Sequence, residues 1–245
     1  MKKLIFIIIL SFFSTPVFAQ DTMKLVYFHN FPPFSWEENK QMHGILIDVV
    51  TEALHSRMGI SLSHEGYPWT RAQKMVEDGN ADAFVTVPTP KRKTYTEISK
   101  EPVVVAMFRL FVKADNPKIG DLKNVRKISD LKEFTIGNYM GNGWADKNLA
   151  GMDVDYGATL DITLKKLVKG RFDVYPGVSQ VARHRIKELG FQNQLTELPN
   201  IIDSNTFNLC IGKKSPYVNI LPKFDETLMK MRKDGKLEEI YDKYK

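Results

Sequence analysis

Residues 103–112 read Val-Val-Val-Ala-Met-Phe-Arg-Leu-Phe-Val, a stretch in which every residue except Arg109 is apolar and most are β-branched or aromatic. Such a run is typical of a buried strand. A second apolar run of this kind lies at residues 207–211. No long polar linker occurs in the chain, so a chain with two lobes must pass between them through ordered segments. We predict that these two runs are the crossing strands.

Other apolar runs of strand character lie on both sides of this stretch, and most alternate with segments in which apolar residues recur at helical spacing. The strand-like runs are residues 24–28, 83–87, 134–137 and 172–175, and the helical segments are residues 44–54, 69–76, 160–168 and 220–231, with a short last helix through Tyr244. This alternation predicts an α/β protein. At 245 residues the chain is long enough for one large domain or for two lobes that each bury a core.

The composition is that of an ordinary globular protein, with 43% hydrophobic and 26% charged residues. It excludes collagen-like, low-complexity and disordered classes. The formal net charge is +6 and the isoelectric point is about 9.2. The basic residues are spread along the chain and form no single run, so we predict no nucleic-acid partner.

The N-terminus has the three parts of a secretory signal. Residues 1–3 supply a positive region, residues 4–13 form an apolar run, and Val17-Phe18-Ala19 places small side chains before a cleavage site. We predict a signal peptide at residues 1–19, cleaved after Ala19. The alternative is a membrane anchor, which would need roughly 18 or more apolar residues.

Cys210 is the only cysteine. An exported chain with one cysteine has no internal disulfide, and no cysteine follows the predicted cleavage site to carry a lipid. We therefore predict a soluble protein of the periplasm, monomeric and without a cofactor. The five histidines show no pair four residues apart and no cysteine partner, so we also predict no metal site.

A set of motifs follows in one order along nearly the whole chain beyond residue 19. They are Phe31-Pro-Pro-Phe-Ser35, Gly44-x-x-x-Asp48, Gly79-Asn-Ala-Asp-Ala83, Thr89-Pro-Lys-Arg92, Glu101-Pro102, Gly170-Arg-Phe-Asp173 and the closing segment 231–244. In this order and spacing the chain resembles the extracellular solute-binding proteins of family 3, the periplasmic amino-acid receptors of ABC importers. The resemblance implies a two-lobed, clam-shell periplasmic binding protein fold of type II with two hinge strands. It also implies that residues 20–104 and 206–245 form lobe 1 and that residues 105–205 form lobe 2.

Arg92 is the first candidate for binding a ligand. Thr89 and Pro90 form a good helix start, because the hydroxyl can cap and proline suits the first helical position. Arg92 then falls in the first turn, where the positive end of the helix favours an anion. A cation at this position is unfavourable for the helix and therefore suggests a functional role. A guanidinium beside free backbone N–H groups can bind a carboxylate. The resemblance implies that Arg92 grips the α-carboxylate of the ligand; the alternative is a surface arginine between Lys91 and Lys93.

A glycine-rich turn is the second candidate. Gly141, Asn142 and Gly143 lie after a predicted strand and before a predicted helix, where glycines let backbone N–H groups approach an anion. The resemblance implies that this turn of lobe 2 meets the ligand opposite Arg92; a plain glycine turn is the alternative. Tyr139 and Asn142 would add polar contacts from the same lobe.

The resemblance implies further site residues in lobe 1. Phe31 and Trp69 fall where related receptors carry rings that sandwich the ligand, although both could instead belong to the core. Arg71 would face the same cleft or lie solvated on a helix. Thr86 retains one of the hydroxyl groups that such receptors often carry before the motif that contains the binding arginine.

Two departures from the family pattern limit what the resemblance implies. Val178 stands where amino-acid receptors carry an acid that binds the ammonium of the ligand. Burying an ammonium without a charge partner is costly, so either another group binds it or the ligand has no α-ammonium. In addition, Val85 and Val87 replace small hydroxyl residues that often precede the binding arginine.

These features predict a protein that captures a small carboxylate-bearing polar solute, an amino acid or a related compound, and delivers it to the membrane permease of an ABC importer. Two alternatives stay open. One is a dehydratase of cyclic carboxylic acids on the same fold, which would need a carboxylate in the cleft as general acid. The other is a ligand-sensing receptor for a membrane signalling protein. The sequence contains no clear candidate for that acid and no nucleophile elbow, so we predict no enzymatic activity.

Overall fold

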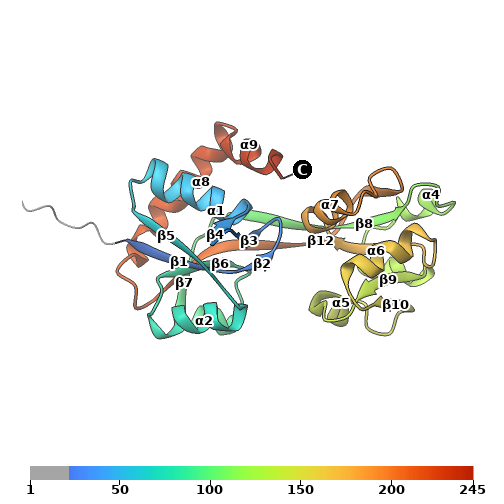
Figure 1. The fold of residues 1–245 in the computed structure, drawn as a ribbon, viewed down its shortest axis with the longest axis horizontal. Helices are drawn as coiled ribbons and strands as arrows, with labels where there is room; N and C mark the ends of the chain where they lie inside the picture. Colours follow the sequence, from blue (N-terminus) through green and yellow to red (C-terminus); the bar gives the residue numbers. More distant parts are fainter. Residues whose placement is uncertain (1–21, 245) are drawn as a thin grey trace, which may run out of the picture.

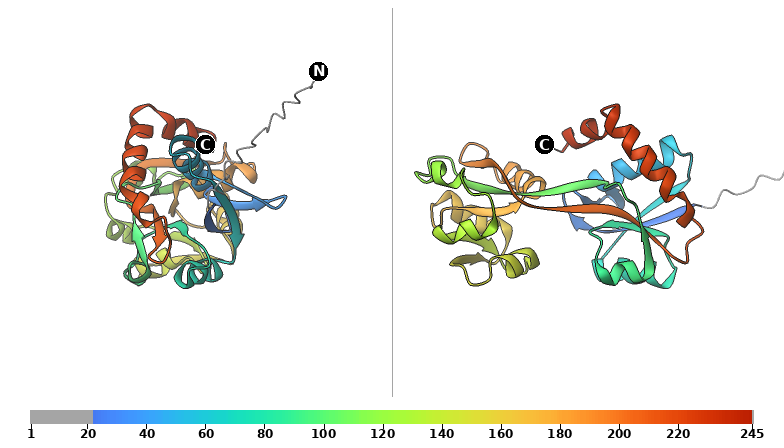
Figure 2. Two further views of the ribbon diagram at one scale, coloured as in Figure 1. Left: turned by 90° about the vertical axis from the view of Figure 1, so that its left-hand side faces the viewer. Right: turned by 180° about the vertical axis from the view of Figure 1, so that it is seen from behind.

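The computed structural model describes residues 22–244, so the predicted signal peptide lies outside the described residues. Within them the chain forms two lobes that lie side by side (Figure 1). Two long strands, β8 (Val104–Lys113) and β12 (Leu195–Gly212), run from one lobe into the other, as the right-hand view of Figure 2 shows. The chain therefore has the predicted two-lobed α/β fold, and both predicted crossing runs are strands.

The first lobe contains the N-terminal and C-terminal parts of the described chain. Its strands are β1 (Met23–Phe28), β2 (Asn30–Phe31), β3 (Ser35–Glu38), β4 (Gln41–His43), β5 (Leu62–Tyr67), β6 (Ala83–Thr86) and β7 (Thr96–Ile98). Its helices are α1 (Ile45–Val50) with its π-helical continuation η1 (Thr51–Arg57), α2 (Trp69–Asp78), α3 (Pro90–Tyr95), the 3₁₀ turn η3 (Val218–Ile220), α8 (Leu221–Lys233) and α9 (Lys236–Asp242). Strand β1 pairs in parallel with β5 and β6, and β12 pairs antiparallel with β6 and β7.

The second lobe is built from the middle of the chain. Its strands are β9 (Ile136–Tyr139), β10 (Val154–Gly157) and β11 (Tyr175–Val178), and its helices are α4 (Ile119–Leu122), the 3₁₀ helix η2 (Ile128–Glu133), α5 (Gly143–Asn148), α6 (Leu160–Val168) and α7 (Ser179–Glu188). Strands β9 and β10 are parallel, and β11 pairs antiparallel with β8. The sheet that joins both lobes has the order β11-β8-β12-β6-β1-β5.

The crossing between the lobes is an ordered ribbon, because β8 and β12 pair antiparallel along most of their length. Val105 lies opposite Thr206, and Ala106 lies opposite Asn205. The predicted lobe bounds, between residues 104 and 105 and between residues 205 and 206, fall on this paired part. The bounds themselves stay a prediction.

Local chemistry explains why α6 begins and ends as predicted. The hydroxyl of Thr159 accepts a hydrogen bond from the N–H of Ile162 at 3.4 Å and so caps the helix. Leu164 and Leu167 bury its inner face. The helix ends before Gly170, whose φ of 65° suits glycine. Among residues 22–244 no helix is long and apolar enough to cross a bilayer.

The strand predicted at residues 172–175 begins later than predicted, as β11. Phe172 packs its ring against Gly137 of β9, where any added Cβ would overlap the ring. Asp173 accepts hydrogen bonds from the N–H and the hydroxyl of Thr135, both at 2.9 Å. The packed ring and the bonded carboxylate hold residues 172–173 against the start of β9. Strand β11 therefore begins only at Tyr175.

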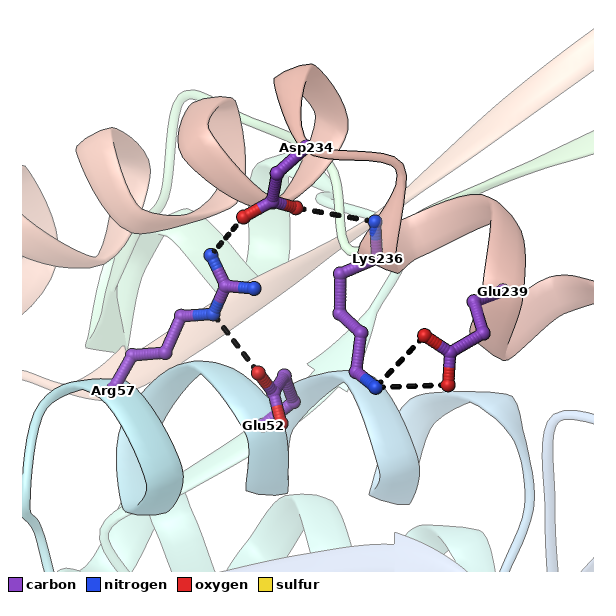
Figure 3. A network of polar contacts seen from close by, with 5 residues as sticks. All are labelled: Glu52, Arg57, Asp234, Lys236 and Glu239. Atoms are coloured by element: carbon purple, nitrogen blue, oxygen red, sulfur yellow. Dashed lines mark hydrogen bonds and ion pairs between the residues drawn. The ribbon is translucent and has the colours of Figure 1, made fainter.

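A network of charged residues fixes the C-terminal helices to η1 (Figure 3). Arg57 of η1 donates to Glu52 at 2.9 Å and to Asp234 at 2.7 Å. Asp234 lies between α8 and α9 and also accepts the N–H of Lys236 at 3.1 Å, while the Lys236 ammonium pairs with Glu239 at 2.8 Å. Arg57 therefore links segments that lie far apart in the sequence.

Replacing Arg57 by alanine is expected to lower the melting temperature by roughly 1–4 °C at neutral pH, because the network is exposed and screened by water. The hydrogen bond from Arg57 lowers the pKa of Asp234 below its ordinary value of 3.8. The pair therefore stabilises the fold fully above that value, and this contribution is lost as the pH falls through the lowered pKa. Thermal melts should show a difference from wild type at pH 7 that shrinks in acid. Lys74→Ala, which removes ion pairs within α2 alone, is the control, and an equal shift in both variants would contradict the prediction.

Candidate functional site

Two neighbouring cavities lie where the lobes face each other, and Phe31 and Phe207 line both. The lobe 1 cavity has a volume of about 200 Å³. The inter-lobe cavity has a volume of about 250 Å³, with walls that include Val87 from the first lobe and Tyr139 and Val178 from the second. We call these two cavities together the cleft.

A tight turn that packs on α1 places Phe31. The N–H of Phe34 donates to the carbonyl oxygen of Phe31 at 2.9 Å, and the N–H of Ile45 donates to that of Pro33 at 2.9 Å. The rings of Phe31, Phe34 and Phe207 form a cluster with centres 5.1 to 6.3 Å apart. Such a cluster offers flat apolar surface against which a ligand can pack.

Arg92 lies beside the cleft and contacts one residue from each cavity. Its guanidinium lies 5.2 Å from the centre of the ring of Trp69, which lines the lobe 1 cavity. Its Nη1 donates to the carbonyl oxygen of Val87, in the inter-lobe cavity, at 2.7 Å. Its Nε donates to Oε1 of Gln73 at 3.2 Å. The predicted cap of α3 is present, since the hydroxyl of Thr89 accepts from the N–H of Arg92 at 3.3 Å.

The partners of the Arg92 side chain are all neutral. Burial lowers the pKa of Arg92, because desolvation disfavours the charged form. The guanidinium nevertheless stays protonated. Within the described chain no carboxylate forms an ion pair with it. A half-buried charge without a counter-charge is unfavourable, so a ligand carboxylate would interact strongly with it.

The turn at residues 141–143 lines the inter-lobe cavity. Gly141 has a φ of 79°, which glycine adopts without strain. Asn142 caps α5, because its Oδ1 accepts from the N–H of Ala145 at 3.4 Å. Its Nδ2 donates to Oδ1 of Asn138 at 2.8 Å. Both ends of the Asn142 amide are thus engaged within the second lobe, and the amide acts as a brace of the turn.

Thr86 and Tyr139 also line the cleft, whereas Arg71 does not. Thr86 is buried at the end of β6. Tyr139 ends β9, and burial raises the pKa of its phenol. Arg71 is exposed on α2, with its guanidinium 4.6 Å from the centre of the Tyr67 ring. The fold therefore brings the predicted residues of both lobes to the cleft, with Arg92 at its edge and Arg71 outside it.

Several cleft residues were not predicted, among them Phe28, Phe34, Phe207, Tyr175 and Asn205. Asn205 and Phe207 lie two residues apart on β12, so their side chains point to the same face of the strand. The strand period was therefore the signal that could have found them. The residues that line the two cavities include none with a charge. In the part of the chain that the structure describes, no group of three His, Cys, Asp or Glu side chains could hold a metal ion.

Comparison with known sequences finds one family over nearly the whole chain. The profile of the bacterial extracellular solute-binding proteins, family 3, matches residues 23–245. The chain is also similar to the probable amino-acid-binding protein YxeM of Bacillus subtilis strain 168. The two are 26% identical over 221 residues, which are 86% of this chain and 79% of that protein.

Solved structures of low sequence identity share the fold. The second substrate-binding domain of GlnP from Lactococcus lactis, in an open conformation, matches with a TM-score of 0.72 at 20% identity, over 92% of this chain and 96% of that one. An ancestral cationic amino acid solute-binding protein, AncCDT-1, matches with a TM-score of 0.70 at 21% identity, over 91% and 95% of the two chains. The fold is thus the predicted type II periplasmic binding protein fold.

Proposed function

Because the chain belongs to the bacterial extracellular solute-binding proteins of family 3, we propose that it captures a small carboxylate-bearing polar solute, an amino acid or a related compound, between its two lobes. Arg92 carries this proposal. It lies half-buried beside the cleft, and its partners are a backbone carbonyl, an amide and an aromatic ring. A carboxylate would supply the counter-charge that these partners lack.

The proposed capture uses both lobes. Phe31, Trp69 and Arg92 would hold the solute from the first lobe, and the turn at residues 141–143 would meet it from the second. A ligand that contacts both lobes stabilises the closed arrangement over the open one. The hinge would lie in the β8–β12 ribbon near residues 103–107 and 205–208. We further propose that the protein acts in the periplasm and presents the closed form to the permease of an ABC importer.

The lining of the cleft supports capture without chemistry. A dehydratase would need an acid or base that touches the substrate. The residues that line the two cavities include no Asp, Glu or His. We therefore propose that no bond of the solute is made or broken.

A thermal-shift screen of small carboxylates, in pairs with and without an α-ammonium, tests the proposal. A ligand at about 100 times its Kd should raise the free energy of unfolding by about 2.7 kcal/mol, or the melting temperature by roughly 5–10 °C. Mass spectrometry of molecules that co-purify from the native periplasm should recover a carboxylic acid. The proposal would be contradicted if no carboxylate raises the melting temperature and no carboxylic acid co-purifies with the protein.

Replacing Val178 by aspartate is expected to improve the binding of α-amino acids. Val178 is partly buried in the wall of the inter-lobe cavity, at the position where the resemblance to amino-acid receptors implies an acid. An aspartate there would supply a counter-charge for an ammonium. We expect the affinity for an amino acid to rise at least about tenfold relative to the same acid without the amine, as calorimetry would measure. Val178→Asn, which lacks the charge, is the control, and equal changes for both ligands would disprove this role.

A further inference from the structure

A third cavity lies between the lobes, on the opposite face of β8 from the cleft; we call it the rear cavity. From Val105 to Arg109 the lining alternates, because Ala106 and Phe108 line the inter-lobe cavity, whereas Val105, Met107 and Arg109 line the rear cavity. Successive side chains of a strand point to opposite faces, so the hinge strand separates the two spaces. In Figure 1, α7 and α9 lie on one side of the β8–β12 ribbon, and α2 and α5 lie on the other. The volume of the rear cavity is about 460 Å³, which exceeds that of either cavity of the cleft.

Both lobes supply walls of the rear cavity. Arg232, Tyr241 and Tyr244 come from the C-terminal part of the first lobe, and Gln180 and Arg183 come from α7 of the second. Because the rear cavity and the cleft lie on opposite sides of the hinge, a rotation that closes the cleft must widen the rear cavity. A molecule that contacts both rear walls in the present arrangement would therefore resist closure of the cleft.

The wall from the second lobe has two arginines that share one carboxylate. Arg109 and Arg183 both form ion pairs with Glu197, and Ser179 donates a hydrogen bond to the same carboxylate. Nε of Arg109 lies 3.7 Å from Oε1 of Glu197. That nitrogen is buried and has no hydrogen-bond partner among the described residues. A further carboxylate at this wall would supply both the acceptor and the charge.

Gln180 adds an acceptor to the same wall. Its Nε2 donates to the carbonyl oxygen of Val105 at 3.0 Å. Its Oε1 is buried without a hydrogen-bond partner in the described chain. Buried polar atoms are nearly always paired with protein, water or ligand. A ligand that carries one hydrogen-bond donor in addition to its carboxylate would pair with Nε of Arg109 and with Oε1 of Gln180.

The opposite wall is largely apolar. Leu237 is buried, and Tyr241 and Tyr244 have hydroxyls that already donate to a backbone carbonyl at 2.7 Å and to a carboxylate at 3.0 Å. Arg232 is paired with a glutamate at 2.8 Å. Glu238 is the acid on this wall. The rings and Leu237 suit an aromatic or aliphatic body.

We propose that the rear cavity binds a small monocarboxylate with an aromatic or aliphatic body and one hydrogen-bond donor, and that this ligand opposes capture in the cleft. Its carboxylate accepts from Arg109 and Arg183, its donor bonds Oε1 of Gln180, and its body packs against Tyr241 and Leu237. By linkage, the rear ligand and the cleft solute weaken each other's binding by the same factor. The coupling rests on the proposed function, whereas the rear site does not.

The first test measures binding of 4-hydroxyphenylacetate by calorimetry in the full chain and in Arg92→Ala, whose cleft is disabled. We expect equal affinity in both proteins and a loss of at least about tenfold in Arg183→Met. Arg183 is exposed, so its replacement leaves the core intact. Arg185→Met is the control, because Arg185 lies on the same helix but pairs with Asp161 and Glu188 outside the rear cavity. No binding to Arg92→Ala up to roughly 10 mM, or equal binding to Arg183→Met and wild type, overturns the site.

The second test separates the hydrogen bond from the charge. Wild type should prefer 4-hydroxyphenylacetate to phenylacetate, and Gln180→Leu should lose this preference while it still binds phenylacetate. A preference that survives in Gln180→Leu overturns the role of that amide.

The third test measures coupling with the carboxylate that the screen identifies for the cleft. Saturating 4-hydroxyphenylacetate should lower the affinity for that solute at least about fivefold in wild type and leave the affinity unchanged in Arg183→Met. Unchanged affinity in wild type overturns the coupling but not the site. If the screen finds no cleft solute, the proposed function fails, while the first test still decides the rear site.

Discussion

Replacing Arg92 by alanine is expected to abolish capture of the carboxylate that the screen identifies, with a loss in affinity of at least about 100-fold. The guanidinium is half-buried. Its Nη1 donates a hydrogen bond to the carbonyl oxygen of Val87, and its Nε donates one to Oε1 of Gln73. This fixes the orientation of the planar group beside the cleft. Removing it would leave the ligand carboxylate desolvated and without a counter-charge. Calorimetry with the purified variant measures the loss.

Two further variants distinguish the charge from its geometry. Lys91→Ala removes an exposed cation one residue away on the same helix and should change the affinity less than about twofold. Arg92→Lys keeps the charge but not the planar fork, so binding should be weaker than in wild type and stronger than in Arg92→Ala. Affinity in Arg92→Ala within a few-fold of wild type would remove the basis of the proposed capture.

Replacing Gly44 by alanine is expected to lower the free energy of unfolding by about 2–4 kcal/mol. Gly44 has φ 125° and ψ 172°, a conformation that only glycine adopts readily. An added Cβ would also overlap the carbonyl oxygen of Phe34 and lie 3.0 Å from that of Pro33. These carbonyls accept the first N–H groups of α1, so the turn that carries Phe31 cannot move away without losing them. Denaturant unfolding monitored by circular dichroism measures the change.

Gly59→Ala separates backbone strain from steric overlap in this test. Gly59 has a φ of 73°, and no atom lies within 4 Å of an added Cβ. Its replacement should cost only about 1 kcal/mol. Because Gly44 supports the turn that carries Phe31, Gly44→Ala should also lower the affinity for the captured solute, whereas Gly59→Ala should not. Equal destabilisation by the two substitutions would show that the contact with Phe34 is unimportant.

Much of the fold could be predicted because local patterns mark its elements. Helix α6 has a capping threonine, an apolar face and a terminal glycine, and β8 is a long apolar run. Strand β5 could not be predicted in this way. Its residues are Leu-Ser-His-Glu-Gly-Tyr, all half-buried, and it lies at the end of the strand order beside β1. A strand at the edge of a sheet buries less surface, so its hydrophobic pattern is weak.

The cleft was predicted less completely than the fold. Phe31, Trp69 and Thr86 line the lobe 1 cavity, and their role in binding a ligand stays a prediction. For Arg71 the sequence leaves two placements open, the cleft or the solvated surface of a helix, and its guanidinium lies over the ring of Tyr67, outside both cavities. The guanidinium of Arg92 also lies over a ring, but that ring, Trp69, lines the lobe 1 cavity. Such contacts depend on packing between elements, which spacing along the chain does not report.

Local sequence patterns specify the strand and helix character of the main segments and the turn residues, because these depend on neighbours within a few positions. Which side chains share a cavity depends instead on tertiary packing. Pairing of β8 with β12 sets Val105 opposite Thr206, about a hundred residues further along the chain. The two faces of β8 then meet different walls, the cleft on one side and the rear cavity on the other. That division follows from the register of two strands packed between two lobes, and no local pattern specifies it.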